Sequence, residues 1–168
     1  MTAFFCRLLY IAITIDLLRN TFAQMNIKIL SVGRVKDPDL RNKISDYTGR
    51  ISRDARIAFQ EIKDSDAETE GRRLIDIIDK EAGYVFALAE EGALYTSAKF
   101  AARISAIHKK LIFVIGGPLG LSPAVKSRAD EILSLSRMTF SHEMAQLFLL
   151  EQLYRGISIN LNRKYHKA

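Results

Sequence analysis

Cysteine is nearly absent from this sequence, because Cys6 is the only one among 168 residues. A lone cysteine excludes an intrachain disulfide and a zinc site built from cysteines, and it suits a reducing compartment. Histidine is also scarce, and His108, His142 and His166 lie too far apart to show the spacing of metal ligands. We therefore expect no metal centre.

Internal repeats, low-complexity segments and linkers rich in glycine and serine are also missing. A chain of 168 residues fits one domain, since a single core usually serves about 100 to 200 residues. Hydrophobic residues make up 48% and charged residues 26%, a balance that excludes wholesale disorder. The formal net charge of +6 favours polyanionic partners such as RNA without identifying one.

Residues 1–24 differ from the rest of the chain. They are mostly apolar, but the uninterrupted run from Leu8 to Ile15 is far shorter than the ~20 residues of a membrane-spanning helix. Phe22-Ala23-Gln24 makes a poor cleavage site for a signal peptide. Because Met25 comes directly before a clear strand pattern, we interpret residues 1–24 as an extension upstream of the true start. A short surface helix and an export signal are the alternatives, and residues 25–168 form the single domain.

Past Met25 the sequence alternates between short apolar strands and amphipathic helices, a pattern that produces βαβ units and a mainly parallel sheet. The expected strands are rich in leucine, β-branched or aromatic residues. They run from Ile27 to Val32, Ile57 to Ile62, Tyr84 to Leu88, Leu111 to Ile115 and Ile132 to Leu135. The sequence therefore predicts the α/β class.

Helices are expected between and after these strands. Asp37 and Pro38 provide a cap and a first turn for a helix that reaches toward Arg53. Two more helices are predicted from Asp66 to Glu81 and from Ser97 to Lys109. The basic residues of the second of these helices are more typical of a solvent-exposed face than of a surface that binds RNA. The last helix begins near Ser141, and its broad apolar stripe suits a dimer contact.

The strongest local signal is the glycine-rich turn Gly116-Gly117-Pro118-Leu119-Gly120, which follows the buried strand ending at Ile115. Open α/β sheets bind ligands where a strand runs into such a turn, because glycine lets the backbone approach a ligand closely. The glycine spacing differs from that of a dinucleotide-binding turn, and no Lys-Ser or Lys-Thr pair follows as in a P-loop. Spacing alone favours a structural turn over a ligand site.

Two further segments carry polar groups. The hydroxyls and backbone groups of Ser134-Leu135-Ser136-Arg137-Met138-Thr139-Phe140 suit recognition of a purine and an amino-acid moiety, although a strand end before a helix cap is the plainer alternative. The tail from Asn162 to Ala168 places basic side chains around Tyr165. Such a tail suits contacts with phosphates and an unpaired base, and a frayed terminus is the alternative.

Several motifs, in this order, resemble those of the RlmH family, whose members methylate N3 of a pseudouridine in large-subunit ribosomal RNA. They are Ile115-Gly116-Gly117-Pro118-Leu119-Gly120-Leu121-Ser122-Pro123, then Leu133-Ser134-Leu135-Ser136-Arg137-Met138-Thr139, then Glu151-Gln152-Leu153-Tyr154-Arg155 and Tyr165-His166. The resemblance covers Met25 to Ala168 and is most specific from residue 111 onward.

The resemblance implies a SPOUT-type α/β domain with a mostly parallel sheet, helices on both faces and a C-terminal trefoil knot, which ordinary topology rules would not predict. It also implies a cytoplasmic homodimer that acts on the large-subunit RNA of the ribosome, with S-adenosylmethionine as methyl donor and neither a metal nor a membrane involved. Carried over by motif, the cofactor-binding residues are Leu88, Gly116, Leu135, Ser136, Arg137, Met138, Thr139 and Phe140.

The chain departs from the family pattern at several positions. Ser141-His142 stands where a Pro-His pair is expected, and Gln146 replaces an arginine expected soon after. The tail reads Asn162-Arg163-Lys164-Tyr165-His166 where His-Pro usually precedes Tyr-His. Residues 1–24 have no counterpart in the family.

The candidate catalytic residues are Arg155, Tyr165 and His166. We hypothesise that the pseudouridine is unstacked into a cleft between subunits, with Arg155 and residues 163–167 on phosphates and Tyr165 or His166 near the base. His166 is the favoured acceptor of the N3 proton, because imidazole exchanges protons near neutral pH. Two rival hypotheses are a SPOUT methyltransferase for transfer RNA, for which the short chain leaves no extra RNA-binding domain, and a non-catalytic ribosome-binding factor.

Overall fold

The computed structural model describes residues 25–166 and contains a five-stranded sheet in the order β2-β1-β4-β3-β5. The strands are β1 (Asn26–Val32), β2 (Arg56–Ile62), β3 (Gly83–Leu94), β4 (Lys110–Ile115) and β5 (Glu131–Ser134). All four pairings between neighbours are parallel, so the carboxyl ends of the strands meet at one edge of the sheet. The predicted α/β class and parallel sheet are confirmed.

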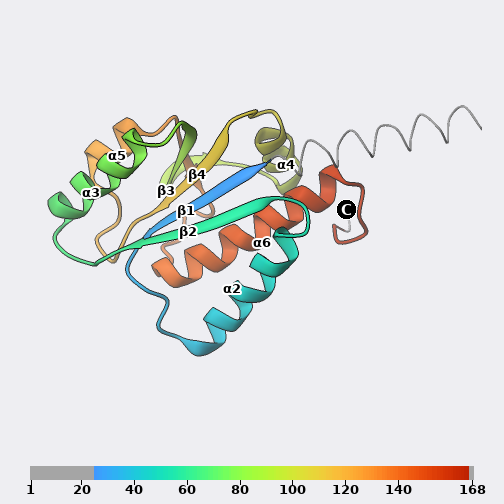
Figure 1. The fold of residues 1–168 in the computed structure, drawn as a ribbon, viewed down its shortest axis with the longest axis horizontal. Coiled ribbons are helices and arrows are strands. Elements are labelled where there is room, and N and C mark those ends of the chain that lie inside the picture. The colour runs from blue at the N-terminus through green and yellow to red at the C-terminus, as the bar shows by residue number, and fades with distance from the viewer. Residues whose placement is uncertain (1–24, 167–168) are drawn as a thin grey trace, which may run out of the picture.

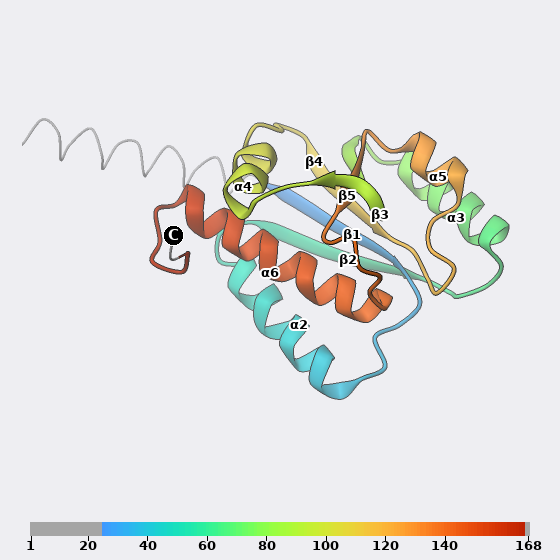
Figure 2. The ribbon, with the colours of Figure 1, turned by 180° about the vertical axis from the view of Figure 1, so that it is seen from behind.

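Helices cover both faces of this sheet, as predicted (Figures 1 and 2). One face carries α2 (Pro38–Ile51), α4 (Ser97–Ser105) and α6 (His142–Asn160), and α6 packs against both of the others. The opposite face carries α3 (Ala67–Asp79) and α5 (Pro123–Arg128), which contact each other. In the predicted trefoil knot, the chain after β5 would pass through the loop that follows β4. The knot stays a prediction.

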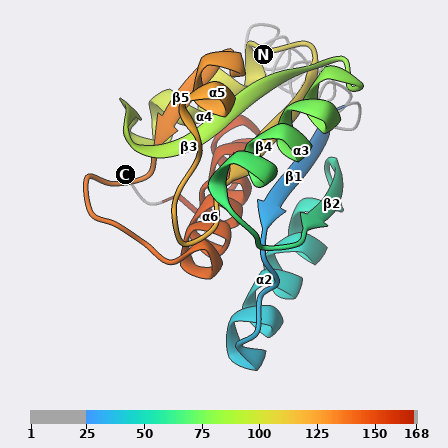
Figure 3. The same cartoon turned by 90° about the vertical axis from the view of Figure 1, so that its left-hand side faces the viewer.

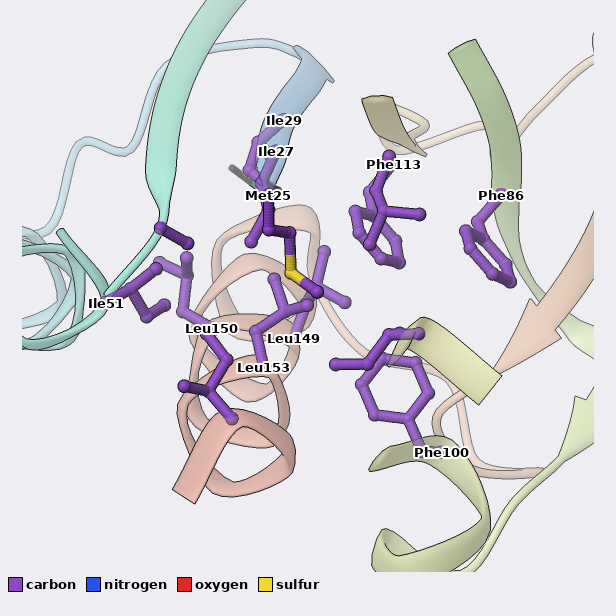
Figure 4. Close-up of a cluster of buried hydrophobic side chains, with 14 of the residues drawn as sticks. Met25, Ile27, Ile29, Ile51, Phe86, Phe100, Phe113, Leu149, Leu150 and Leu153 are labelled. Carbon is purple, nitrogen blue, oxygen red and sulfur yellow. The ribbon is translucent and has the colours of Figure 1, made fainter. Parts of the chain in front are cut away.

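The hydrophobic core has two parts because the central strands are buried on both faces. Alternate residues of β4 enter different parts: Phe113 points toward α6, and Ile112 points toward α3 and α5. Figure 4 shows the α6 side, where Leu149, Leu150 and Leu153 lie below the strands. The Phe113 ring stacks on Phe86 of β3 with the ring centroids 4.9 Å apart.

Helix ends agree with the capping signals in the sequence. Asp37 accepts a hydrogen bond from the Asp39 amide at 2.8 Å, and Ser141 accepts one from the Met144 amide at 3.4 Å. The predicted end of α4 was wrong, because this helix ends at Ser105 rather than Lys109. A short helix, α5, was not predicted, since six residues are too few to show a helical period.

Strand β3 is longer than predicted, and this difference shapes the site. Leu88 and Ala93 both pair with Leu133 of β5, so the intervening residues 89–92 bulge out of the ladder. At Gly92 an added Cβ would lie 2.6 Å from the Ile132 carbonyl oxygen, so the close approach of β5 requires glycine. The prediction stopped at Leu88 because exposed Glu90 and Glu91 interrupt the apolar pattern.

Within residues 25–166, no helix is long and apolar enough to cross a membrane. The interpretation of residues 1–24 lies outside the described residues.

Candidate functional site

A cavity of about 580 Å³ lies at the carboxyl edge of the sheet. Three segments surround it: the β3 bulge, the loop between β4 and α5, and the loop between β5 and α6. Figure 3 shows the course of the backbone on this side of the molecule. The lining residues are Leu88, Ala89, Glu90, Glu91, Ile115, Gly116, Gly117, Pro118, Leu119, Gly120, Leu121, Lys126, Leu133, Leu135, Ser136, Met138, Thr139, Phe140, Ser141, His142 and Ala145.

Seven of the eight residues predicted to bind the cofactor line this cavity, although they come from three separate segments. They are Leu88, Gly116, Leu135, Ser136, Met138, Thr139 and Phe140. The exception is Arg137, whose guanidinium donates hydrogen bonds to the carbonyls of Glu90 and Gly92. The structure therefore brings the predicted set together, with Arg137 placed behind the cavity wall rather than in it.

The loop after β4 is a tight backbone structure. The Gly120 amide donates to the Gly117 carbonyl at 2.9 Å, and Gly120 has a φ of +73°, which disfavours any side chain there. A Cβ added at Gly116 would lie 2.5 Å from the Gly120 carbonyl carbon. The glycines therefore let this wall fold back on itself, which leaves Leu119 74% exposed at its tip.

Charged groups sit at the rim of the cavity. The Lys126 ammonium lies 2.5 Å from the Glu91 carboxylate, and this hydrogen bond lowers the pKa of Glu91. The Glu90 carboxylate accepts a hydrogen bond from the Thr139 hydroxyl at 2.6 Å. The rim thus offers carboxylate oxygens and an ammonium group within one opening, a donor and acceptor set that suits a zwitterionic ligand.

His142 also lines the cavity, although it was not among the residues predicted to bind the cofactor. One ring nitrogen, Nε2, lies 3.3 Å from the Arg34 carbonyl oxygen, and the ring packs over Gly33 at the end of β1. Its position two residues after the polar segment 134–140 was the available signal. The polar residues Glu90 and Glu91 were missed because the strand was expected to end before them.

The three candidate catalytic residues lie together in a second cluster, at the C-terminal end of α6. Arg155 pairs with Glu151, and its guanidinium carbon lies 4.9 Å from the centroid of the Tyr165 ring. The Tyr165 hydroxyl donates to Glu151 at 3.1 Å and lies 3.2 Å from the Tyr47 hydroxyl. A guanidinium nitrogen of Arg155 lies 3.4 Å from Nδ1 of His166.

These contacts limit which groups of the cluster can donate or accept a hydrogen bond. Burial, followed by the Tyr47 hydrogen bond and the Glu151 charge, raises the pKa of Tyr165, so the phenol keeps its proton at neutral pH. Arginine can only donate, so Nδ1 of His166 is the acceptor in its contact with Arg155. In this arrangement the Nδ1 lone pair of His166 is already occupied.

The rest of the described tail is packed rather than frayed. Both terminal nitrogens of Arg163 reach the Asp54 carboxylate, at 2.7 and 2.6 Å. Lys164 is exposed. Gln146, at the position where the family resemblance predicts an arginine, is buried, and its Oε1 has no hydrogen-bond partner among the described residues.

One chain does not bring the cavity and the C-terminal cluster together. The cavity contacts α6 at Ala145, and the cluster begins ten residues later at Arg155. At 1.5 Å per residue, these positions are about 15 Å apart along the helix axis. Across residues 25–166, no three histidine, cysteine, aspartate or glutamate side chains gather as a metal site would require.

Comparison with known proteins gives matches over the whole described range. A family described as "Predicted SPOUT methyltransferase" matches residues 25–166. Two relatives named "Ribosomal RNA large subunit methyltransferase H" are 42% identical (Bifidobacterium animalis subsp. lactis) and 41% identical (Shouchella clausii), each over 160 aligned residues. Each alignment covers 85% of this chain and 100% of the relative.

Solved structures share the fold at low sequence identity. A probable methylase family protein from Haemophilus influenzae Rd KW20 has a TM-score of 0.55 at 14% identity. The match covers 86% of this chain and 71% of the Haemophilus chain. A probable methyltransferase from Bordetella pertussis Tohama I has a TM-score of 0.50 at 9% identity. The match covers 84% of this chain and 99% of the Bordetella chain. These likenesses show the shared fold. The family match and the sequence relatives show that the chain belongs to the SPOUT methyltransferase family.

Proposed function

We propose that this protein transfers a methyl group from S-adenosylmethionine to N3 of a pseudouridine in the 23S RNA of the large ribosomal subunit. The relatives that match it over their full length are named as methyltransferases of large-subunit ribosomal RNA. The net charge of +6 suits an RNA substrate. Since ribosomal RNA is the substrate, the proposed compartment is the cytoplasm.

The observation that carries the proposal is that seven of the eight residues expected from sequence motifs to hold the cofactor line one cavity. Its volume of about 580 Å³ falls within the ~300–1,000 Å³ typical of small-molecule sites. It opens at the carboxyl edge of a parallel sheet, where α/β proteins bind their ligands.

The lining residues fit S-adenosylmethionine chemically. Leu88, Leu133 and Leu135 provide apolar surface for an adenine ring, and the loop around Gly116 presents backbone groups that a side chain would cover. The carboxylates at the rim can face the ammonium of the amino-acid moiety. When bound, the cofactor supplies an electrophilic methyl group, so the protein mainly has to orient it and to remove the N3 proton.

A homodimer with shared sites would join the cavity to the C-terminal cluster. Within one chain the two lie about 15 Å apart along α6, so Tyr165 and His166 would serve the cavity of a partner subunit. Several apolar side chains near the cavity are available for such a contact, since Met138 is 73% exposed and Met144, Leu147 and Phe148 of α6 are only partly buried. We assign the target base to the cleft between the subunits.

RNA binding would also prepare the proton acceptor. Arg155 occupies Nδ1 of His166 in the free protein, and a phosphate would compete for Arg155 as a charge-assisted acceptor. Moving Arg155 onto a phosphate frees the Nδ1 lone pair of His166 for the N3 proton. Tyr165 would then act by stacking or as a hydrogen-bond donor, because it keeps its own proton.

Transfer of a labelled methyl group to purified RNA tests this function. The substrates are ribosomes, free large-subunit RNA and transfer RNA, each from cells that lack this gene. Label is expected in large-subunit RNA and, after digestion, in a methylated pseudouridine. Label in transfer RNA would support the transfer RNA enzyme instead. Calorimetry that detects no binding of S-adenosylmethionine would support a non-catalytic ribosome-binding factor.

A further inference from the structure

Arg137 lies outside the cavity, yet it connects two of the three segments that form the cavity wall. Its Nη1 atom donates hydrogen bonds to the backbone carbonyls of Glu90 and Gly92, the latter at 3.0 Å. Both acceptors belong to the β3 bulge, and Arg137 itself belongs to the loop after β5. One side chain therefore ties the two segments together.

A second contact joins the same two segments. The Thr139 hydroxyl donates to the Glu90 carboxylate at 2.6 Å. The loop is also braced internally, because the Met138 amide donates to the Ser136 hydroxyl at 3.0 Å and Ser134 donates to the Ser136 carbonyl at 2.9 Å. The loop is therefore shaped by its own bonds, and Arg137 and Thr139 attach it to the bulge.

The position of the bulge depends on such contacts because its residues are not paired with β5. Residues 89–92 lie between two residues that pair with the same residue of β5, so they have no partners in that ladder. Ala89, Glu90 and Glu91 nevertheless line the cavity. The position of this wall is thus set by side-chain contacts, of which those from Arg137 hold the backbone directly.

We propose that Arg137 is a positioning residue for the methyl donor: it clasps the Glu90–Gly92 bulge to the loop after β5 and so sets the width of the cofactor cavity. This inference rests on the proposed function for the identity of the ligand. It changes the role expected from the sequence, since Arg137 acts through the backbone of residues 90 and 92 rather than by touching the cofactor.

The affinities of two ligands distinguish an Arg137 that positions the cavity wall from an Arg137 that contacts the cofactor directly. S-adenosylhomocysteine carries the charged amino-acid moiety, whereas 5′-methylthioadenosine shares the adenosine and the thioether and lacks that moiety. A residue that binds the cofactor carboxylate matters only for the first ligand. A residue that places the wall matters for both ligands by a similar factor.

The experiment compares the wild type, Arg137→Ala and Arg128→Ala by calorimetry with each ligand. Arg128 is the matched control, because this α5 residue forms an exposed ion pair with Asp79 of α3 and does not line the cavity. Arg137→Ala is expected to weaken both ligands about five- to tenfold, as the loss of partly exposed charged hydrogen bonds implies. Turnover at saturating S-adenosylmethionine is expected to stay within about twofold of the wild type. The weaker binding is expected to appear as a higher KM for the cofactor.

Unchanged affinity for both ligands would overturn the clasp. A loss for S-adenosylhomocysteine alone would overturn it too, in favour of direct contact with the amino-acid moiety. Hydrogen exchange of the free protein gives a test that needs no ligand: amides of residues 89–92 should exchange faster in Arg137→Ala and not in Arg128→Ala. Failure of the wild type to bind either ligand would count against the proposed function, while the exchange result would still decide the clasp.

Discussion

The hydroxyl of Tyr165 donates a hydrogen bond to the carboxylate of Glu151 across 3.1 Å, and this contact joins the segment after α6 to the middle of that helix. Glu151 also pairs with Arg155, so a single carboxylate organises two of the three candidate catalytic side chains. The tail is thereby held in one arrangement before any RNA is present.

The pH dependence of stability should reveal this contact. Burial, Tyr47 and Glu151 raise the pKa of Tyr165 above its ordinary value near 10. A pKa that is higher in the folded than in the unfolded state stabilises the fold fully below pH ~10 and loses that contribution as the pH rises further. Urea unfolding above pH ~10 should therefore show a steeper loss of stability for the wild type than for Tyr165→Phe. Parallel curves would contradict the half-buried position of this phenol.

Substitution of Gly116 should close the cavity wall. The Cβ of Gly116→Ala would lie 2.5 Å from the Gly120 carbonyl carbon, so the loop has to move. We expect S-adenosylmethionine affinity to fall at least tenfold, measured by calorimetry, because the moved loop can no longer present its backbone to the ligand.

The control for this variant is Gly49→Ala on the exposed side of α2, where nothing lies within 4 Å of an added Cβ. That change should leave cofactor affinity unaltered and stabilise the fold by about 0.5–1 kcal/mol, since alanine favours a helix over glycine. Equal cofactor affinity in Gly116→Ala and the wild type would show that this loop does not form the binding wall.

The buried amide of Gln146 should reduce stability. Its Oε1 has no hydrogen-bond partner among residues 25–166, and an unpaired buried acceptor costs free energy. Gln146→Leu should therefore raise the free energy of unfolding by about 1 kcal/mol in denaturant titrations. Gln152→Leu, which removes a 2.9 Å bond from Ser97, should give no such gain. A loss of stability in Gln146→Leu would mean that the amide is satisfied, for example across a subunit interface.

Mixed dimers test the shared sites. Subunits carrying Gly116→Ala keep an intact tail, and subunits that lack residues 165–168 keep an intact cavity. If each site combines the cavity of one subunit with the tail of the other, random mixing of two inactive variants should restore about a quarter of wild-type methylation, because half of the dimers are mixed and each has one complete site. Activity that stays at the level of the separate variants would place cavity and tail function within one subunit.

Much of the fold could be predicted from the sequence because local patterns and tertiary packing agree there. The run Leu111–Ile115 is apolar at every position, and β4 is buried on both faces at the centre of the sheet. Asp37 and Ser141 cap helices as expected. Prediction failed where a tertiary contact decides the structure: the second half of β3 exists because Gly92 allows β5 to approach, which no local pattern reveals.

The candidate site was predictable to a similar extent. The motifs identified residues that line one cavity, but Arg137 turned away from it, since two carbonyls of the bulge compete for its guanidinium. His142 was missed because an N-terminal helix position explained it without reference to β1, whose end lies beside it. The separation between the cavity and Tyr165 depends on the length of α6, and sequence motifs alone do not convert that length into a distance.

The most direct measurement is mass spectrometric mapping of large-subunit RNA from cells with and without this gene. A pseudouridine methylated at N3 should be present in the wild type, absent after deletion, restored by the intact gene and not restored by Gly116→Ala. An identical modification pattern in both strains, or a loss confined to transfer RNA, would contradict the assignment of this protein to large-subunit ribosomal RNA.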